Sequence, residues 1–422
     1  MRRDAGCPRL DHLLSRRSFM AATGAAAAGI GLAGALPAVA TAALVGKQKR
    51  VLQIYLQGGL SQLESWDPKP GTRYGGPFRA IPTSTPGTHI SELLPHTAQR
   101  MHLLSIVRSI NIKTGDHGQG RLFMEMGRRA GAFPYLGSVA SRYLTPASAE
   151  LPGYIHISGR GLNDNTSAFL GARYSQLKLT GPEAPPNLES PAGVTAEAAR
   201  RQEEFRQRIS ARFASRGGQP ALTEAFESSY SMADKLMQRQ SLFEQEPTAK
   251  EKERYGEHDF GVNCLLAKRL LENGATCVKV THHGYDTHAE NFNFHLEQLG
   301  EFDRTFSMLL DDIYDAGMLD STLVMVMSEF GRTPKINQRY GRDHWGTAWS
   351  IALGGCGIQP GAVIGSTNEE GTAVADREVD AGHLFHTYLQ ALGIDSYSNH
   401  DLGGRTVPMG DPAKSPIKEL LA

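Results

Sequence analysis

The stretch Thr281-His-His-Gly-Tyr-Asp-Thr-His288 directly follows the apolar run Ala275-Thr-Cys-Val-Lys-Val280. Such a run is typical of a buried β-strand, and open α/β sheets gather ligands where their parallel strands end. Asp286 and His288 are two positions apart, so on extended backbone both side chains would point to the same side. Imidazole with carboxylate suits zinc, manganese or iron. The stretch therefore predicts a metal site at a strand end; the alternative is a polar loop carrying surface histidines.

Similar apolar runs recur along the chain and alternate with helical patterns. Apolar residues at three- and four-residue spacing predict amphipathic helices over residues 299–313 and 384–392. Strands are predicted at residues 51–56, 103–107, 154–157, 275–281 and 322–327, with short ones at 350–353 and 362–364. This alternation predicts an α/β fold, with a doubly wound, mostly parallel sheet and helices on both faces.

Residues 181–258 differ from the rest of the chain. Prolines open this segment, and a charged stretch rich in Gln and Arg follows from 197 to 257. The composition favours two or three solvated helices, inserted as a cap in one α/β domain that spans residues 41–422.

The N-terminus has the features of a targeting segment. Ser15-Arg-Arg-Ser-Phe-Met20 is a twin-arginine pattern, an Ala- and Gly-rich run follows, and Ala38-Val-Ala40 fits a cleavage site. A transmembrane helix is the rival, but Ala and Gly give little transfer energy and Pro37 interrupts the run. The sequence therefore predicts a signal peptide at residues 1–40, cleaved near Ala40, with the twin-arginine export machinery as partner and a periplasmic or extracellular location.

Composition narrows the classes of function. The chain of 422 residues has 44 basic and 44 acidic side chains and 40% hydrophobic residues. A net charge of zero gives no reason to expect a nucleic-acid partner, and the composition is that of a globular protein without a stable membrane span. The cysteines outside the signal, Cys264, Cys277 and Cys356, are too widely spaced for a disulfide scaffold.

A second polar cluster follows the run at 322–327. Glu329 would lie at the carboxyl end of that strand, and Arg332 could hold an anionic ester group by a bidentate contact. Alternatively, these two residues pair with each other. Asp343 and His344 come next, as an adjacent acid and imidazole. Together the candidate ligands are enough for one or two metal ions: Asp286, His288, Glu329, Asp343, His344 and, from the end of the first strand, Glu64.

A third motif, Lys113-Thr-Gly-Asp-His-Gly-Gln-Gly120, stands between a predicted strand and a helical pattern. A strand, a glycine-rich turn and a helix together make an anion-binding helix N-terminus. His117 is the candidate here, either as a metal ligand or as a catalytic acid or base; Asp116 is explained well enough as a helix cap.

Four of these motifs, in this order, resemble a family of exported twin-arginine bacterial proteins of uncharacterised function. They are Gly58-Gly-Leu-Ser-Gln-Leu-Glu-Ser-Trp-Asp-Pro-Lys-Pro70, Tyr285-Asp-Thr-His288, Ser328-Glu-Phe-Gly-Arg332 and Gly341-Arg-Asp-His-Trp345. The family is grouped with the alkaline phosphatase and sulfatase superfamily, and the resemblance covers residues 51–422. It implies an alkaline phosphatase-like fold, divalent metals at strand ends, and hydrolysis of phosphate or sulfate esters; calcium joins zinc and manganese as a possible ion.

The chain departs from that superfamily where a nucleophile is expected. It has no Cys-x-Pro-x-Arg and no Asp-Ser-Ala after the second strand, and Gly58-Gly59 stands where phosphatases place a metal aspartate. The leading hypothesis is thus an exported metal-dependent hydrolase in which metal-activated water attacks the ester. The rival is a non-catalytic, metal-containing binding protein for sulfated or phosphorylated extracellular glycans.

Overall fold

The computed structural model describes residues 48–157, 166–183, 185, 188, 193–217, 219–402 and 404–422. The predicted signal segment at 1–40, including its cleavage site, lies outside these residues. None of the helices in the described ranges combines the length and the apolar character needed to cross a bilayer.

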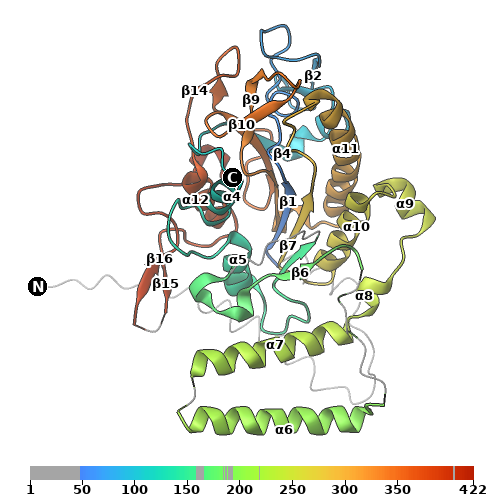
Figure 1. Ribbon diagram of the computed structural model, residues 1–422, viewed down its shortest axis with the longest axis vertical. Helices are drawn as coiled ribbons and strands as arrows, with labels where there is room; N and C mark the ends of the chain where they lie inside the picture. The colour runs from blue at the N-terminus through green and yellow to red at the C-terminus, as the bar shows by residue number, and fades with distance from the viewer. Residues whose placement is uncertain are drawn as a thin grey trace, which may run out of the picture. The chain divides into compact units, whose positions relative to one another are not determined.

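Eight strands form one sheet in the order β12-β4-β11-β8-β1-β7-β5-β6 (Figure 1). Neighbouring strands run parallel, except that β11 is antiparallel to both β4 and β8. The α/β prediction, with a mostly parallel sheet, is confirmed. The strands are β1 (Arg50–Leu56), β4 (Leu104–Ile110), β5 (Tyr154–Ile157), β6 (Leu177–Leu179), β7 (Cys277–His282), β8 (Thr322–Met327), β11 (Trp349–Gly355) and β12 (Val363–Ile364).

The reversal of β11 follows from the path of the chain. A hairpin of β9 (Gly331–Ile336) and β10 (Arg342–Trp345) follows β8 at the carboxyl edge of the sheet. The chain therefore enters β11 from the edge at which β8 ended. Both β4 and β8 oppose β11, so they run in the same direction, and the carboxyl ends of β1, β4, β7 and β8 share one edge.

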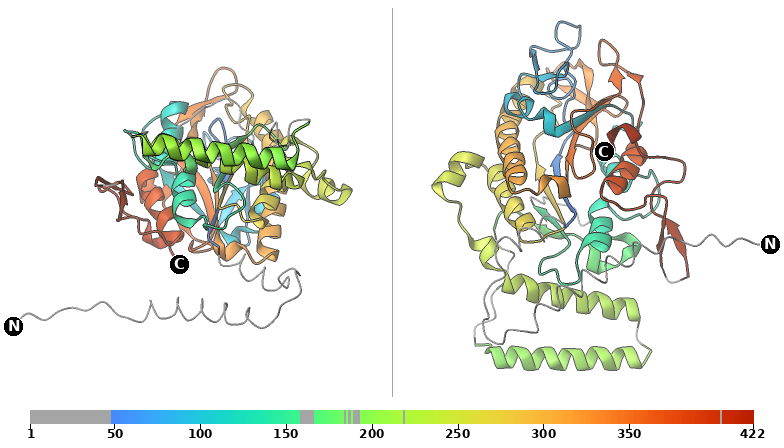
Figure 2. Two further views of the ribbon diagram at one scale, coloured as in Figure 1. Left: turned by 90° about the horizontal axis from the view of Figure 1, so that it is seen from below. Right: turned by 180° about the vertical axis from the view of Figure 1, so that it is seen from behind.

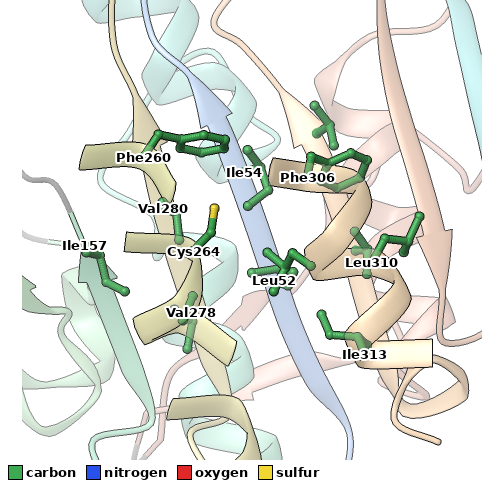
Figure 3. Packing of buried hydrophobic residues seen from close by; sticks show 14 of the residues in the cluster. Leu52, Ile54, Ile157, Phe260, Cys264, Val278, Val280, Phe306, Leu310 and Ile313 are labelled. Atoms are coloured by element: carbon green, nitrogen blue, oxygen red, sulfur yellow. The ribbon is translucent and has the colours of Figure 1, made fainter. Parts of the chain in front are cut away.

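Helices cover both faces of the sheet. On β1, Leu52 and Ile54 belong to the cluster of buried residues on one face, whereas Val51 and Tyr55 belong to the cluster on the other. Figure 3 shows the first face, where α10 (Asp259–Glu272) and α11 (Asn291–Asp315) supply residues such as Phe260 and Phe306. The second face carries α4 (His117–Met126), α5 (Leu136–Leu144) and α12 (Ala381–Ala391). Alternation along each strand thus fills two cores.

Two helices match the predicted amphipathic patterns, with different bounds. α11 starts eight residues before the predicted 299–313, because its first two turns carry several polar and exposed residues that break the apolar period. α12 begins after Asp380, whose carboxylate accepts hydrogen bonds from the backbone N–H groups of Gly382 and His383 in a capping box. The short edge strand β6 was not predicted, because three residues carry too little pattern.

The described residues of the segment at 181–258 form four helices: α6 (Ala196–Ser215), α7 (Pro220–Gln238), α8 (Ser241–Glu244) and α9 (Ala249–Tyr255). The long helices α6 and α7 lie side by side (Figures 1 and 2). The end of α7 is anchored by the buried Leu236, and α6 has no buried residue.

The remaining elements are small: the two-stranded pairs β2 (Ala80–Pro82) with β3 (His89–Ser91), β13 (Ser366–Thr367) with β14 (Val374–Asp376), β15 (Asn399–Asp401) with β16 (Thr406–Pro408), and α3 (Pro95–Ala98).

Candidate metal centre

Asp286 is the centre of a cluster at the carboxyl edge of the sheet. Its Oδ1 atom lies 3.2 Å from Nε2 of His288 and 3.2 Å from Nε2 of His344. Its Oδ2 atom lies 3.4 Å from Nε2 of His117. These residues come from the loop after β7, from β10 and from the first turn of α4. Segments far apart along the chain therefore bring imidazole and carboxylate groups together.

The hydrogen bonds of His288 and His344 fix which ring nitrogen of each residue faces Asp286. Nδ1 of His344 lies 2.6 Å from the carbonyl oxygen of Gly115, and Nδ1 of His288 lies 2.8 Å from Oδ1 of Asp343. A carbonyl or an ionised carboxylate only accepts, so both Nδ1 atoms donate and each neutral ring carries its lone pair on Nε2. Metal-ligating histidines are oriented in this way.

Both Nε2 lone pairs then point at the same place. The Nε2 atoms of His288 and His344 lie 2.9 Å apart. Burial, followed by the charge of Arg332, lowers the pKa of His344, which keeps that ring neutral near pH 7. Two lone pairs facing a carboxylate repel one another unless a cation lies among them. The donor set of the cluster therefore fits a divalent metal ion.

Arg332 positions Asp286. Its side chain is fully buried, and Nη2 donates to Oδ1 of Asp286 and to the carbonyl oxygen of Gly58. Nε and Nη1 donate to the carbonyl oxygens of Gly59 and Arg342, at 3.0 and 2.9 Å. The sequence predicted Arg332 as a clamp for an anionic ester, or as a partner of Glu329. In the structure each of its three nitrogens has an acceptor, and its carboxylate partner is Asp286.

Partial burial acts to raise the pKa of Asp286, but hydrogen bonds from His117 and Arg332 outweigh it. The pKa of Asp286 consequently lies well below its ordinary value, so its carboxylate is anionic throughout the physiological range.

His117 lies between two carboxylates. Nδ1 is 2.7 Å from Oε1 of Glu329, on the opposite side of the ring from Asp286. Hydrogen bonds to Asp286 and Glu329 raise the pKa of His117 to about 9. The buried Glu329 also accepts from the backbone N–H of Gly58 at 3.0 Å and from the hydroxyl of Ser328 at 3.0 Å. Glu329, predicted as a metal ligand, thus contacts the cluster through His117.

One group of ligand atoms lies within 4.8 Å of one another, supplied by His117, Asp286 and His344. Nε2 of His288 is closer still to two of these residues, which makes it a fourth candidate. Asp343 is exposed and binds the Nδ1 atom of His288 rather than facing Asp286.

Glu64, the sixth predicted ligand, occupies a different place. Its two oxygens accept from Nη2 and Nε of Arg342 at 2.8 and 3.0 Å, and Nδ2 of Asn291 donates to it at 3.1 Å. Burial acts to raise the pKa of Glu64, but the charge of Arg342 brings it below its ordinary value. Glu64 therefore forms a buried ion pair with Arg342, and this pair holds β10, the strand that carries His344.

The supporting roles of Asn337 and Gly58 were not predicted from the sequence. Asn337 donates to Oδ1 of Asp343 and to the carbonyl oxygen of His288, both at 3.0 Å. Gly58 has φ +121°, and a Cβ there would lie 2.3 Å from the backbone nitrogen of Asp286. The Gly58-Gly59 pair was the available signal, because adjacent glycines after a strand often mark a close approach of two backbones.

Three solved structures are similar to this chain over most of its length. The sulfatase PsFucS1 from Pseudoalteromonas sp. is 13% identical, with 84% of this chain and 70% of that chain covered and a TM-score of 0.40. A phosphonate monoester hydrolase from Silicibacter pomeroyi is 12% identical, with 88% of this chain and 78% of that chain covered and a TM-score of 0.39. An alkaline phosphatase from the Antarctic bacterium TAB5 is 10% identical, with 82% of this chain and 99% of that chain covered and a TM-score of 0.35. At these identities and TM-scores the likeness carries no conclusion about activity.

Among curated proteins, none matches the sequence. One protein-family model, DUF1501, described as a protein of unknown function, matches residues 48–421. Because the match spans nearly the whole chain, this protein belongs to the DUF1501 family.

Proposed function

We propose that the protein is a metal-dependent hydrolase of phosphate or sulfate esters. The observation that carries the proposal is the convergence of Nε2 of His288, Nε2 of His344 and Oδ1 of Asp286 within 3.2 Å, with both Nδ1 protons directed away. Zinc, manganese and calcium remain the candidate ions. A divalent ion bound there would polarise an ester oxygen and lower the pKa of water.

Each residue of the cluster has its own part in this proposal. Asp286, His288 and His344 hold the ion, and Arg332 fixes the Asp286 carboxylate. His117 donates or accepts a proton at Nε2, with Glu329 orienting the ring through Nδ1. Asp343 and Glu64 keep the ligands in place, the first through His288 and the second through Arg342.

The test combines elemental analysis with a panel of aryl phosphates and aryl sulfates. We expect bound divalent metal in the purified protein, and turnover of at least one ester that Asp286→Ala abolishes. Asp315→Ala is the matched control, because Asp315 is an exposed carboxylate at the end of α11, and it should leave both properties unchanged. Metal without turnover of any ester would reject the hydrolase and favour the binding protein for sulfated or phosphorylated glycans.

We also propose that the protein is exported by the twin-arginine route and acts in the periplasm or outside the cell. Support comes from Ser15-Arg-Arg-Ser-Phe-Met20 and the small residues ending at Ala40. Cell fractionation of the wild type and of Arg16→Lys with Arg17→Lys tests this. The double variant should stay in the cytoplasm; equal export of both proteins would exclude the route.

A further inference from the structure

An apolar stripe on the α6–α7 hairpin is largely exposed to solvent, and among the described residues its ring contacts are with Arg206 and Arg208 of α6. Phe205, Ile209 and Phe213 are spaced four residues apart on α6, and Leu222, Phe226 and Tyr230 are spaced the same way on α7. All six are 45–59% exposed. They line a groove of about 570 Å³, whose lining comes from the two helices alone. Four-residue spacing puts each set on one face of its helix.

Helix α6 lacks the packing that normally stabilises a helix of its length. It has 20 residues and none is buried. Most helical stability in proteins comes from burying an amphipathic face, not from intrinsic propensity. By contrast, α7 is fixed near its end by Leu236, and Nζ of Lys235 donates to the carbonyl oxygen of Ala149 at 2.6 Å. The hairpin is thus attached at one end and presents its stripe to solvent.

The charges on the two helices indicate that a second copy of this chain binds the apolar stripe. Between its bounds α6 carries five arginines and three glutamates, a net charge of +2, whereas α7 carries three acids and one lysine, a net charge of −2. Two copies of the hairpin could meet face to face about a two-fold axis parallel to the helices. Each α6 would then lie antiparallel to the α7 of the other copy, so that opposite charges meet and the six apolar side chains of each copy are covered.

We propose that the α6–α7 hairpin is a self-association surface, through which two copies of this chain form an antiparallel four-helix bundle. The alternative two-fold axis would place α6 on α6 and α7 on α7, which sets like charges against each other. The observed charge distribution disfavours that arrangement. The proposal does not depend on the proposed hydrolase activity, because the groove residues belong to a different segment from the metal cluster.

Sedimentation analysis of the full chain is the first test. We expect twice the chain mass at about 10 μM, a concentration typical of a moderately stable interface. Phe205→Glu with Phe226→Glu should shift the dissociation constant by at least ~100-fold, since both changes bury charge at the centre of the interface. Tyr314→Glu is the control, because Tyr314 is 57% exposed on α11 and lies outside the hairpin; it should leave the mass unchanged.

A charge-swap pair tests whether complementary charges hold the two copies together. Arg208→Glu with Arg212→Glu reverses charge on α6, and Glu224→Lys with Glu227→Lys reverses it on α7. Each double variant should be monomeric alone, and an equimolar mixture should recover the double mass as a heterodimer. A monomeric wild type would overturn the proposal, as would a double mass in the Phe205→Glu, Phe226→Glu protein. Binding of a monomeric wild-type chain to lipid vesicles would assign the stripe to a membrane surface instead.

Discussion

The Nε2 atoms of His288 and His344 lie 2.9 Å apart, although the residues are 56 positions apart in the sequence. Each ring donates its Nδ1 proton to an oxygen on the far side, so in the neutral form of either ring Nε2 is an acceptor. The geometry of the pair fits a shared cation, and it rests on two specific acceptors, Asp343 and the carbonyl oxygen of Gly115.

Asp343→Ala should weaken metal binding without removing a ligand. The substitution leaves Nδ1 of His288 without its acceptor, so the ring loses its fixed orientation and tautomer. Loss of such an outer contact typically weakens metal affinity by about 10–100-fold. Competition with a chromophoric chelator measures the change. Glu297→Ala, an exposed acid on α11, is the control; unchanged affinity in Asp343→Ala would show that the Asp343–His288 contact does not orient a ligand.

His117→Gln separates a proton-transfer role from a ligand role. If His117 transfers a proton, the variant should keep its metal and lose turnover by about 10²–10⁴-fold, the usual contribution of a general acid or base. Metal content and kcat are measured on the same preparation. Loss of the metal itself would place His117 among the ligands, together with Asp286 and His344.

A buried ion pair beneath the cluster should contribute strongly to stability. Nζ of Lys279 on β7 lies 2.5 Å from Oε1 of Glu125 on α4, and both side chains are almost completely buried. Lys279→Met should lower the free energy of unfolding by about 3–5 kcal/mol, because Glu125 is left as an unpaired buried charge. Adding Glu125→Leu should recover most of that loss, as measured by denaturant titration. An equal or greater loss in the double variant would contradict this reasoning.

The lowered pKa of His400 should make the free energy of unfolding decrease at acidic pH. This side chain is buried, Nδ1 lies 2.9 Å from the hydroxyl of Tyr143, and burial together with Arg142 and Arg128 lowers the pKa of His400 to about 4. The unfolded chain takes up the proton first, so stability is full above pH 6.5 and falls by ~1–3 kcal/mol as pH drops towards 4.

His400→Gln should flatten that part of the pH profile relative to the wild type, in denaturant titrations between pH 7 and pH 4. The same slope in both proteins would assign the acid sensitivity to other groups.

The sequence was sufficient to predict most of the sheet and most of the cluster. Strands such as β1 and β8 are long apolar runs, and a parallel sheet necessarily collects the loops after its strands at one edge. Asp286, His288 and His344 were therefore predictable as neighbours from their positions after strands or in the next polar loop. Their hydrogen-bond partners were not, because a carbonyl oxygen such as that of Gly115 leaves no trace in side-chain identity.

The roles of Glu64 and Arg332 were beyond the sequence for a related reason. A register shift separates Arg342 from His344 in the β9–β10 hairpin, so Arg342 enters the core and reaches Glu64 while His344 stays at the cluster. Strict alternation would have put Arg342 and His344 on the same side. The partner of Arg342 depends on that irregularity, and Arg332 pairs with Asp286, which is 46 positions away along the chain.

The buried Arg332 bears on whether folding precedes metal binding. Its contacts to Gly58, Gly59 and Asp286 tie the loop after β1 to the loop after β7 through hydrogen bonds between protein groups. We therefore expect the chain to fold with a preformed site and to bind a metal ion afterwards. Removal of the metal with a chelator should abolish the proposed activity and leave the fold intact, so that added metal can bind again.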